Sequence, residues 1–218
     1  MEKFKKCITF IKQPLLITVV LMLICGLAFP LALTGISQVL FPNQANGSLI
    51  TVDGEVVGSK NVGQDFTKDY FMKGRPSAYQ YNTYYVDENG KELLNDGSEF
   101  GGVSSGSQNM SATNPDLAAR VENDIEEFLA ANPGVKREDI PTDLLTASGS
   151  GLDPHISKAS ALIQLDAISK ASGLTVEELE KIVDDNTTAK VLGIFGEEIV
   201  NVLEVNIDIA TAMGIINQ

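Results

Sequence analysis

The stretch QPLLITVVLMLICGLAFPLALTGISQVLFPNQANGSLITV, from Gln13 to Val52, has 40 consecutive residues without a charged side chain. Its apolar centre, Leu15 to Leu33, has about the length that a helix needs to cross a ~30 Å hydrocarbon layer at ~1.5 Å per residue. We therefore predict a transmembrane anchor over residues 13–36. Pro30 lies inside this span and allows a kink near Phe29, because its ring removes a backbone hydrogen bond.

The charges before this stretch predict its orientation. A short arm, residues 1–12, carries Lys3, Lys5, Lys6 and Lys12, and the polar residues just after the span carry no cation. By the positive-inside rule the arm lies in the cytoplasm and the rest of the chain lies outside the cell membrane. The alternative is a cleavable secretory signal, whose apolar part is usually ~7–15 residues long and ends in an A-x-A-like site. The longer run found here has no such site at its end, so we favour an uncleaved, single-pass anchor.

The remaining sequence, residues 37–218, is long enough for one domain with its own core. Twelve of the 16 cationic residues and 28 of the 29 acids follow the anchor, so this outer domain carries a formal charge near −16. Such a field repels nucleic acid, which excludes that class of partner. Both cysteines, Cys7 and Cys25, precede the domain, which must therefore fold without a disulfide.

Local signals in the outer domain predict both strands and helices. Asp53-Gly54 and Asn89-Gly90 are typical of hairpin turns. The Gly-, Ser- and Asn-rich segment 96–114 indicates a flexible or partner-ordered loop. The predicted helices begin at the caps Asn114, Ser157 and Thr175, the second running to Ala171. Residues 190–195 and 199–203 read as two strands, and the whole is an α+β domain.

The densest unusual run is Thr146 to Ser157, which contains the only histidine, His155. A nucleophilic Ser150 in a Gly-x-Ser-x-Gly turn fails, because Ser148 stands where glycine is needed. Asp153 and His155 could begin a metal site, but no further histidine or cysteine outside the membrane completes one. The structural alternative is a tight turn at residues 148–151 leading into a helix, with His155 bonded locally. A binding role remains open, because a glycine-rich loop before a helix can direct N–H groups at an anion.

Arg75 lies in a second compact run, Gly74-Arg75-Pro76, beside the aromatic residues Tyr70 and Phe71. The planar guanidinium suits a carboxylate, either across an interface or in an internal salt bridge, and the internal bridge is favoured.

Several runs, taken in order, resemble the C subunits of the Kdp potassium-transporting ATPases over nearly the whole chain. They are residues 34–38, 41–49, 63–66, 70–82, 113–115, 147–157 and 192–203. The resemblance implies an accessory, non-catalytic subunit of a high-affinity, ATP-driven potassium uptake complex, required for its assembly. It also implies a catalytic chaperone that raises the ATP affinity of the P-type ATPase subunit, with Ser148, Gly149, Ser150 and Gly151 as candidates for nucleotide binding.

The implied partners are a potassium-translocating subunit, the P-type ATPase catalytic subunit and a small single-helix subunit. ATP, potassium and magnesium are used by the complex, and no cofactor is expected on this chain. Candidate partner contacts are Gln44, Asn46, Arg75, Asp153 and His155. Because an outer domain cannot touch cytoplasmic ATP, we expect it to cap the outer mouth of the translocating subunit. A membrane-anchored enzyme using Ser150 or His155 and an anchored sensor domain are the alternatives.

Overall fold

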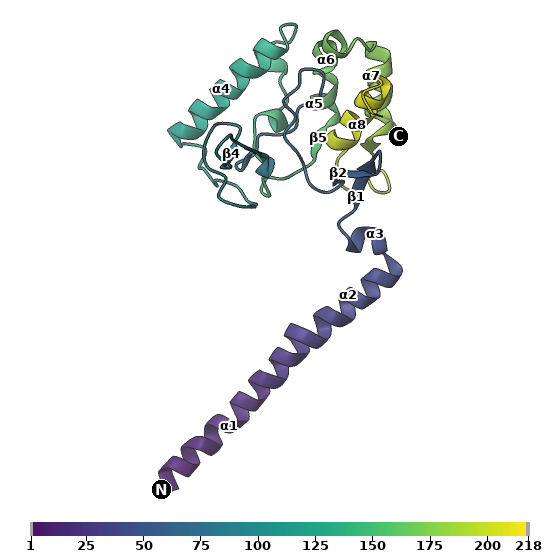
Figure 1. The fold of residues 1–218 in the computed structure, drawn as a ribbon. Coiled ribbons are helices and arrows are strands. Elements are labelled where there is room, and N and C mark those ends of the chain that lie inside the picture. The colour runs from purple at the N-terminus through teal and green to yellow at the C-terminus, as the bar shows by residue number, and fades with distance from the viewer. Residues whose placement is uncertain (1, 217–218) are drawn as a thin grey trace. The chain divides into compact units, whose positions relative to one another are not determined.

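The computed structural model describes the backbone of residues 2–216 and the side chains of residues 10–216 (Figure 1). The side chains of Lys3, Lys5 and Lys6, on which the predicted orientation rests, lie outside the described residues. The chain divides into two compact units, residues 1–48 and 49–218. Each unit is described by itself below.

The first unit is an apolar helix with a π-helical turn in its middle. It consists of α1 (Glu2–Leu23), the π turn Ile24–Ala28 and α2 (Phe29–Leu40). Its apolar part, Phe10–Leu40, is long enough to span a membrane, and the side chains of residues 10–36 are all exposed, as lipid-facing groups would be. The Phe29 N–H bonds the Ile24 carbonyl, so the irregularity precedes Pro30, close to the expected kink.

A short helix, α3 (Pro42–Ala45), ends the first unit. Asn46 and Gln38 exchange two side-chain hydrogen bonds of 3.2 and 3.3 Å, and the Asn46 amide also donates to the Pro42 carbonyl over 2.7 Å. Asn46 therefore ties α3 to the end of α2, and Gln44 is exposed.

In its described residues the second unit, called the outer domain after its expected location, contains two hairpins and a small three-stranded sheet. β1 (Leu49–Val52) pairs with β2 (Glu55–Ser59), and β3 (Tyr84–Val86) pairs with β4 (Glu92–Leu94). The third sheet has the antiparallel order β5-β7-β6, built from β5 (His155–Ser157), β6 (Thr187–Thr188) and β7 (Ile199–Asn201). Asp53 and Gly54 both have positive φ angles, which confirms the first predicted turn.

Within the described residues the outer domain also contains five helices and three short 3-10 turns. The helices are α4 (Pro115–Ala131), α5 (Lys158–Leu162), α6 (Leu165–Ser172), α7 (Val176–Asp185) and α8 (Val202–Ala212). The 3-10 turns are Gln80–Asn82, Arg137–Asp139 and Thr142–Leu144. Asn114 caps α4 and Thr175 forms a capping box on α7, as predicted. The mixture confirms an α+β domain behind one apolar helix.

Three predicted elements are corrected by the structure. The helix expected from Ser157 to Ala171 is broken at residues 163–164, and β5 precedes it. Residues 190–196 do not pair with β7 but form a tight loop closed by the isolated bridge Val191–Phe195. The strand expected over 199–203 ends at Asn201, whose side chain accepts from the N–H groups of Leu203 and Glu204 and so starts α8.

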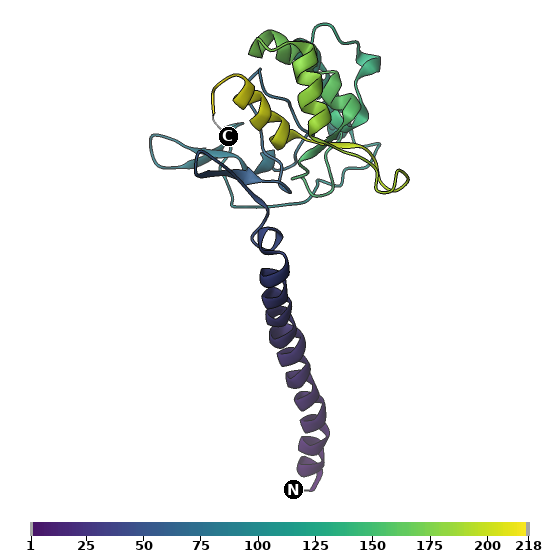
Figure 2. The same cartoon turned by 90° about the vertical axis from the view of Figure 1, so that its right-hand side faces the viewer.

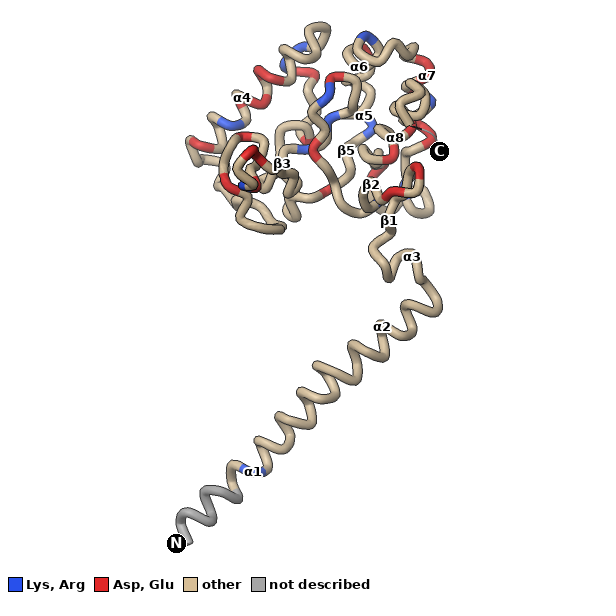
Figure 3. The backbone as a smooth tube through the Cα atoms, viewed as in Figure 1, with Lys and Arg blue, Asp and Glu red and all other residues tan. Residues whose placement is uncertain are grey.

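The main core lies where α8 packs against β5, β7 and the helices α6 and α7. Its members share near-complete burial: Met72, Ile156, Ala161, Leu165, Ile168, Leu179, Val183, Val200, Val202, Val205 and Ile209. A separate cluster of Ile125, Ile140 and Leu144 attaches α4 to the domain. The acids are spread over the surface of the outer domain rather than gathered in one place (Figure 3).

Candidate functional site

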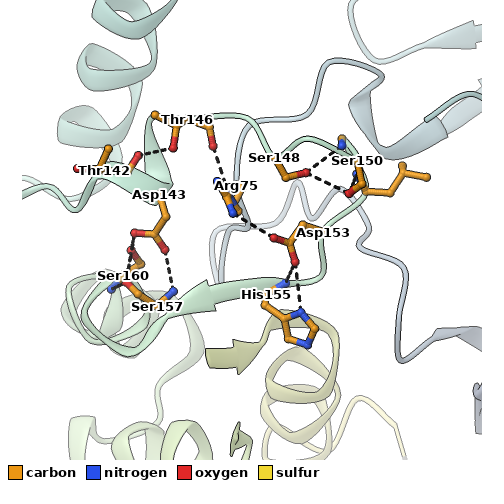
Figure 4. A network of polar contacts seen from close by, with 12 residues as sticks. Arg75, Thr142, Asp143, Thr146, Ser148, Ser150, Asp153, His155, Ser157 and Ser160 are labelled. Carbon is orange, nitrogen blue, oxygen red and sulfur yellow. Dashed lines mark hydrogen bonds and ion pairs between the residues drawn. The ribbon is translucent and has the colours of Figure 1, made fainter. Parts of the chain in front are cut away.

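A polar network joins the two runs that the sequence singles out (Figure 4). Arg75 and Asp153, 78 positions apart, form an ion pair with 3.0 Å between Nη1 and Oδ2. The Arg75 Nε–H also donates to the Thr146 carbonyl over 3.3 Å. The predicted internal salt bridge of Arg75 is therefore confirmed. Its guanidinium binds both ends of the segment 146–153 and so holds them together.

His155 belongs to the same network through Asp153. The Asp153 Oδ1 atom accepts from the His155 backbone N–H over 3.0 Å and lies 3.2 Å from its Nδ1. The pKa of Asp153 is lowered, chiefly by the hydrogen bond from the His155 side chain, then by its backbone N–H and the nearby Arg75. The local bonding expected for His155 is confirmed, and Asp153 is held as a carboxylate.

The Ser148–Gly151 segment is a tight turn whose two serine hydroxyls bond to nearby groups of the same run. The Ser148 hydroxyl accepts from the Gly151 N–H over 2.8 Å and lies 3.2 Å from the Ser150 hydroxyl. The Ser150 hydroxyl accepts in turn from the Leu152 N–H over 3.2 Å. Two backbone donors of the run are thus used internally. The turn leads into β5 rather than directly into a helix.

Gly151 is the contact point between this turn and the loop 96–114. It has a φ of +66°, and an added Cβ would overlap the Gly106 carbonyl oxygen. The Gly106 N–H donates to the Ser150 carbonyl over 2.6 Å, and the Ser77 hydroxyl donates to the Gly151 carbonyl over 2.6 Å. The predicted loop, residues 96–114, contains no helix or strand, but these hydrogen bonds attach it to the Ser-Gly turn.

Tyr81 contacts the backbone of both members of the ion pair. Its hydroxyl donates to the Arg75 carbonyl over 2.8 Å and lies 3.4 Å from the Asp153 carbonyl. Burial, assisted by the charge of Asp153, raises the pKa of Tyr81 to about 12. The ring packs on Gly63, where any Cβ would overlap it.

Asp143 forms a second node of hydrogen bonds at the start of α5. Its carboxylate accepts from the Ser157 N–H over 2.7 Å and from the Ser160 hydroxyl over 2.6 Å. Burial alone would raise the pKa of Asp143, but these bonds outweigh it and lower the pKa. No sequence motif singled out this residue. The available signal was an acid placed before Ser157, which caps α5, and Ser160, which lies in the first turn of that helix.

Two buried amides fix the backbone that carries Arg75. Asn206 on α8 accepts from the Met72 N–H over 2.7 Å and donates to the Met72 carbonyl over 3.0 Å. Gln164 does the same for Lys73, with 2.9 and 3.2 Å. These side chains replace the neighbouring strand that the 70–75 segment lacks, so they position Arg75 from the core outward.

A pocket of about 370 Å³ opens beside the network. Its polar lining consists of Arg75, Thr142, Asp143, Asp153, His155, Ser157, Glu197 and Glu198. Within the described side chains, no group of three His, Cys, Asp or Glu residues is arranged to hold a metal. No hydrogen bond within residues 10–216 joins His155 to Ser148 or Ser150, and Figure 4 shows its ring on the far side of Asp153 from both serines. The arrangement is suited to holding segments together.

The structure thus brings together most of the predicted site residues. Ser148, Gly149, Ser150 and Gly151 form the turn, and Arg75, Asp153 and His155 lie beside it. Gln44 and Asn46 belong to the first unit. Sequence reasoning missed the supporting residues, because their partners are distant in sequence.

Comparison with known proteins gives a consistent result. The family model described as KdpC, K+-transporting ATPase, c chain, matches residues 11–211. The potassium-transporting ATPase KdpC subunit of Clostridium kluyveri is 58% identical over 208 residues, covering 95% of this chain and 96% of the relative. The KdpC subunit of Clostridioides difficile is 57% identical over 209 residues, covering 94% and 99%. That of Caldanaerobacter subterraneus is 44% identical over 199 residues, covering 91% and 93%.

Proposed function

Because this chain belongs to the KdpC family and is a subunit of a K+-transporting ATPase, we propose that its outer domain is a rigid assembly and coupling element. The domain caps the extracytoplasmic mouth of the potassium-translocating subunit, and the apolar helix packs against the membrane helices of the complex. The lysines of the N-terminal arm hold that end in the cytoplasm. ATP, magnesium and potassium are handled by the partner subunits.

The observation that carries this proposal is the bonding of the Ser-Gly turn and its neighbours. The hydroxyls of Ser148 and Ser150 accept from the backbone of their own turn. The Asp153 carboxylate is shared between Arg75 and His155. A catalytic nucleophile needs a base within hydrogen-bond reach, whereas an element that transmits force or position needs fixed internal contacts. The network supports the second role.

An influence on ATP affinity follows from this position only through conformational coupling. If the outer domain binds one state of the pump more tightly, it shifts the equilibrium toward that state and changes the apparent ATP affinity. Coupling of this kind is typically worth ~1–3 kcal/mol, or about 5–150-fold, and it is reciprocal. ATP must therefore change the affinity of the pump for this chain by the same factor. This reciprocity separates coupling from direct nucleotide binding by the Ser-Gly turn.

The test is purification from the native membrane under potassium limitation, with the tag at the cytoplasmic end. The full chain is compared with a truncation to residues 1–48, which ends at the boundary between the two compact units. We expect the full chain to retain a P-type ATPase subunit and a many-helix translocating subunit in fixed ratio. The truncation should lose them or lower the apparent potassium affinity. Full assembly and unchanged transport with residues 1–48 would overturn the proposed capping role.

Two point variants provide the catalytic control. Ser150→Ala and His155→Ala remove both side chains that an anchored enzyme could use. We expect potassium-stimulated ATP hydrolysis by the assembled complex to change less than about threefold in each variant. Loss of hydrolysis with the complex still assembled would instead assign chemistry to this turn.

A further inference from the structure

The loop of residues 190–196, here called the apolar hairpin, exposes four large apolar side chains. Val191 is 65% exposed, Leu192 83%, Ile194 77% and Phe195 63%. None of them belongs to the buried clusters of the outer domain. Figure 2 shows the hairpin, in yellow-green, projecting away from the body of the domain. Such a concentration of exposed apolar side chains is typical of an interaction site.

The hairpin holds this shape by its own backbone. Val191 and Phe195 exchange two N–H to carbonyl bonds of 2.9 and 3.0 Å. Leu192 has a φ of +54° and Gly193 a φ of +73°. A positive φ is unfavourable for leucine and far better tolerated by asparagine. Leu192 therefore stabilises neither the core nor the turn. The role left for its side chain is contact with another molecule.

Acidic groups lie directly beside the hairpin. Glu197 and Glu198 follow it in sequence and line the 370 Å³ pocket together with Asp143 and Asp153. Arg75 is the cation in that lining, and it is already paired with Asp153. With Lys190 at the start of the hairpin, two cations stand against these four acids, so the surface next to the apolar side chains is net negative. Anionic lipid headgroups are repelled by such a surface, whereas a protein that presents basic side chains is attracted.

We propose that the apolar hairpin and the acidic pocket together form one docking surface for a partner subunit. The partner has an apolar depression that receives Leu192, Ile194 and Phe195, and a lysine or arginine that enters the pocket near Glu197. This inference rests on the proposed role as a pump subunit, and it assigns that role a specific contact. The core of a typical protein interface is apolar and its rim is polar, as this surface is.

The first experiment uses Leu192→Asn in the full-length, N-terminally tagged chain. Asparagine suits the positive φ, so the thermal unfolding midpoint of the free chain should stay the same or rise. Recovery of the partner subunits after a salt wash should fall by at least about tenfold. Val86→Asn is the matched control, since Val86 is also an exposed apolar residue of a hairpin, 60% exposed, and its recovery should match that of the unmodified chain.

The outcomes separate this inference from the proposed function. If the unmodified chain retains no pump subunits, the proposed function fails. If the unmodified chain retains them and Leu192→Asn retains them equally well at every salt concentration, only the docking surface is overturned. A lower unfolding midpoint in Leu192→Asn would also count against it, because the leucine would then serve the fold.

A second experiment identifies the occupant. The outer domain has no cysteine, so Leu192→Cys, with Cys7→Ser and Cys25→Ser, places one thiol on the hairpin. A charged, membrane-impermeant maleimide is applied to the assembled complex and to the chain alone in vesicles of phosphatidylethanolamine and phosphatidylglycerol. We expect labelling to be at least tenfold slower in the complex than in the vesicles. Slow labelling in the vesicles would mean that lipid or a second copy covers the hairpin, and it would overturn the protein partner.

Discussion

Replacement of Asn206 by leucine should destabilise the outer domain more than any surface change of the same kind. The Asn206 side chain is 2% exposed, and its amide is bonded to both backbone groups of Met72, which is itself fully buried. Leucine has a similar size but cannot donate or accept. The Met72 N–H and carbonyl would then be buried without a partner.

The expected magnitude follows from those two orphaned groups. A buried donor or acceptor left unsatisfied costs about 1–3 kcal/mol, so Asn206→Leu should cost about 2–5 kcal/mol of unfolding free energy. For a domain of this size that corresponds to a drop of about 5–15 °C in unfolding temperature. Asn123→Leu, on the exposed face of α4, is the matched control and should change stability by less than about 0.5 kcal/mol.

Tyrosine emission is a suitable assay for urea unfolding of the full chain in detergent. All five tyrosines lie between residues 70 and 85, and the chain has no tryptophan. The signal therefore reports on the outer domain and on the very segment that Asn206 holds. If Asn206→Leu unfolds within about 0.5 kcal/mol of the unmodified chain, the buried amide does not support Met72 and the reasoning is refuted.

Three further outcomes follow from the network. Gly151→Ala should cost at least ~1–2 kcal/mol from its left-handed backbone, and more from overlap with Gly106, as denaturant unfolding would show. Because burial raises the pKa of Tyr81 to about 12 and an exposed tyrosine titrates near ~10, the unmodified domain should lose stability between those pH values. Tyr81→Phe should lose less over the same range, and parallel profiles would contradict this. Since its hydrogen bonds lower the pKa of Asp143, Asp143→Asn should be about 1–3 kcal/mol less stable at neutral pH, with the difference shrinking below the usual aspartate pKa of ~3.9. A difference that persists at low pH would exclude the carboxylate as its cause.

Local signals in the sequence predicted the elements that depend on local geometry. Asp53-Gly54 supplied two positive φ angles, and Asn114 and Thr175 supplied helix caps, so the corresponding hairpin and helices appear where expected. The strand predicted over 199–203 is present as β7 for its first three residues only, because α8 begins at Val202. The cap at Asn201, with Glu204 three positions later, was the competing signal for α8.

The candidate site was predictable only in part. The runs around Arg75 and His155 were recognisable as unusual, and an internal ion pair was expected for the arginine. Its partner could not be read from spacing, because Asp153 lies 78 positions away. The amide supports from Asn206 and Gln164 belong to helices that look like ordinary core elements. Their roles depend on a long-range approach of the 70–75 segment, which no local pattern encodes.

The π-helical turn at Ile24–Ala28 changes how the apolar helix meets its surroundings. Such a turn holds one residue more than an α-helical turn, and each α-helical residue advances the side-chain direction by about 100°. The side chains of α2 are therefore rotated about the helix axis relative to the positions they would have if α1 continued without the π turn. A stripe of side chains that faces one neighbour along α1 does not continue along α2. The helix therefore has two successive lateral faces, so it is able to contact one protein along α1 and a different one, or lipid, beyond Phe29.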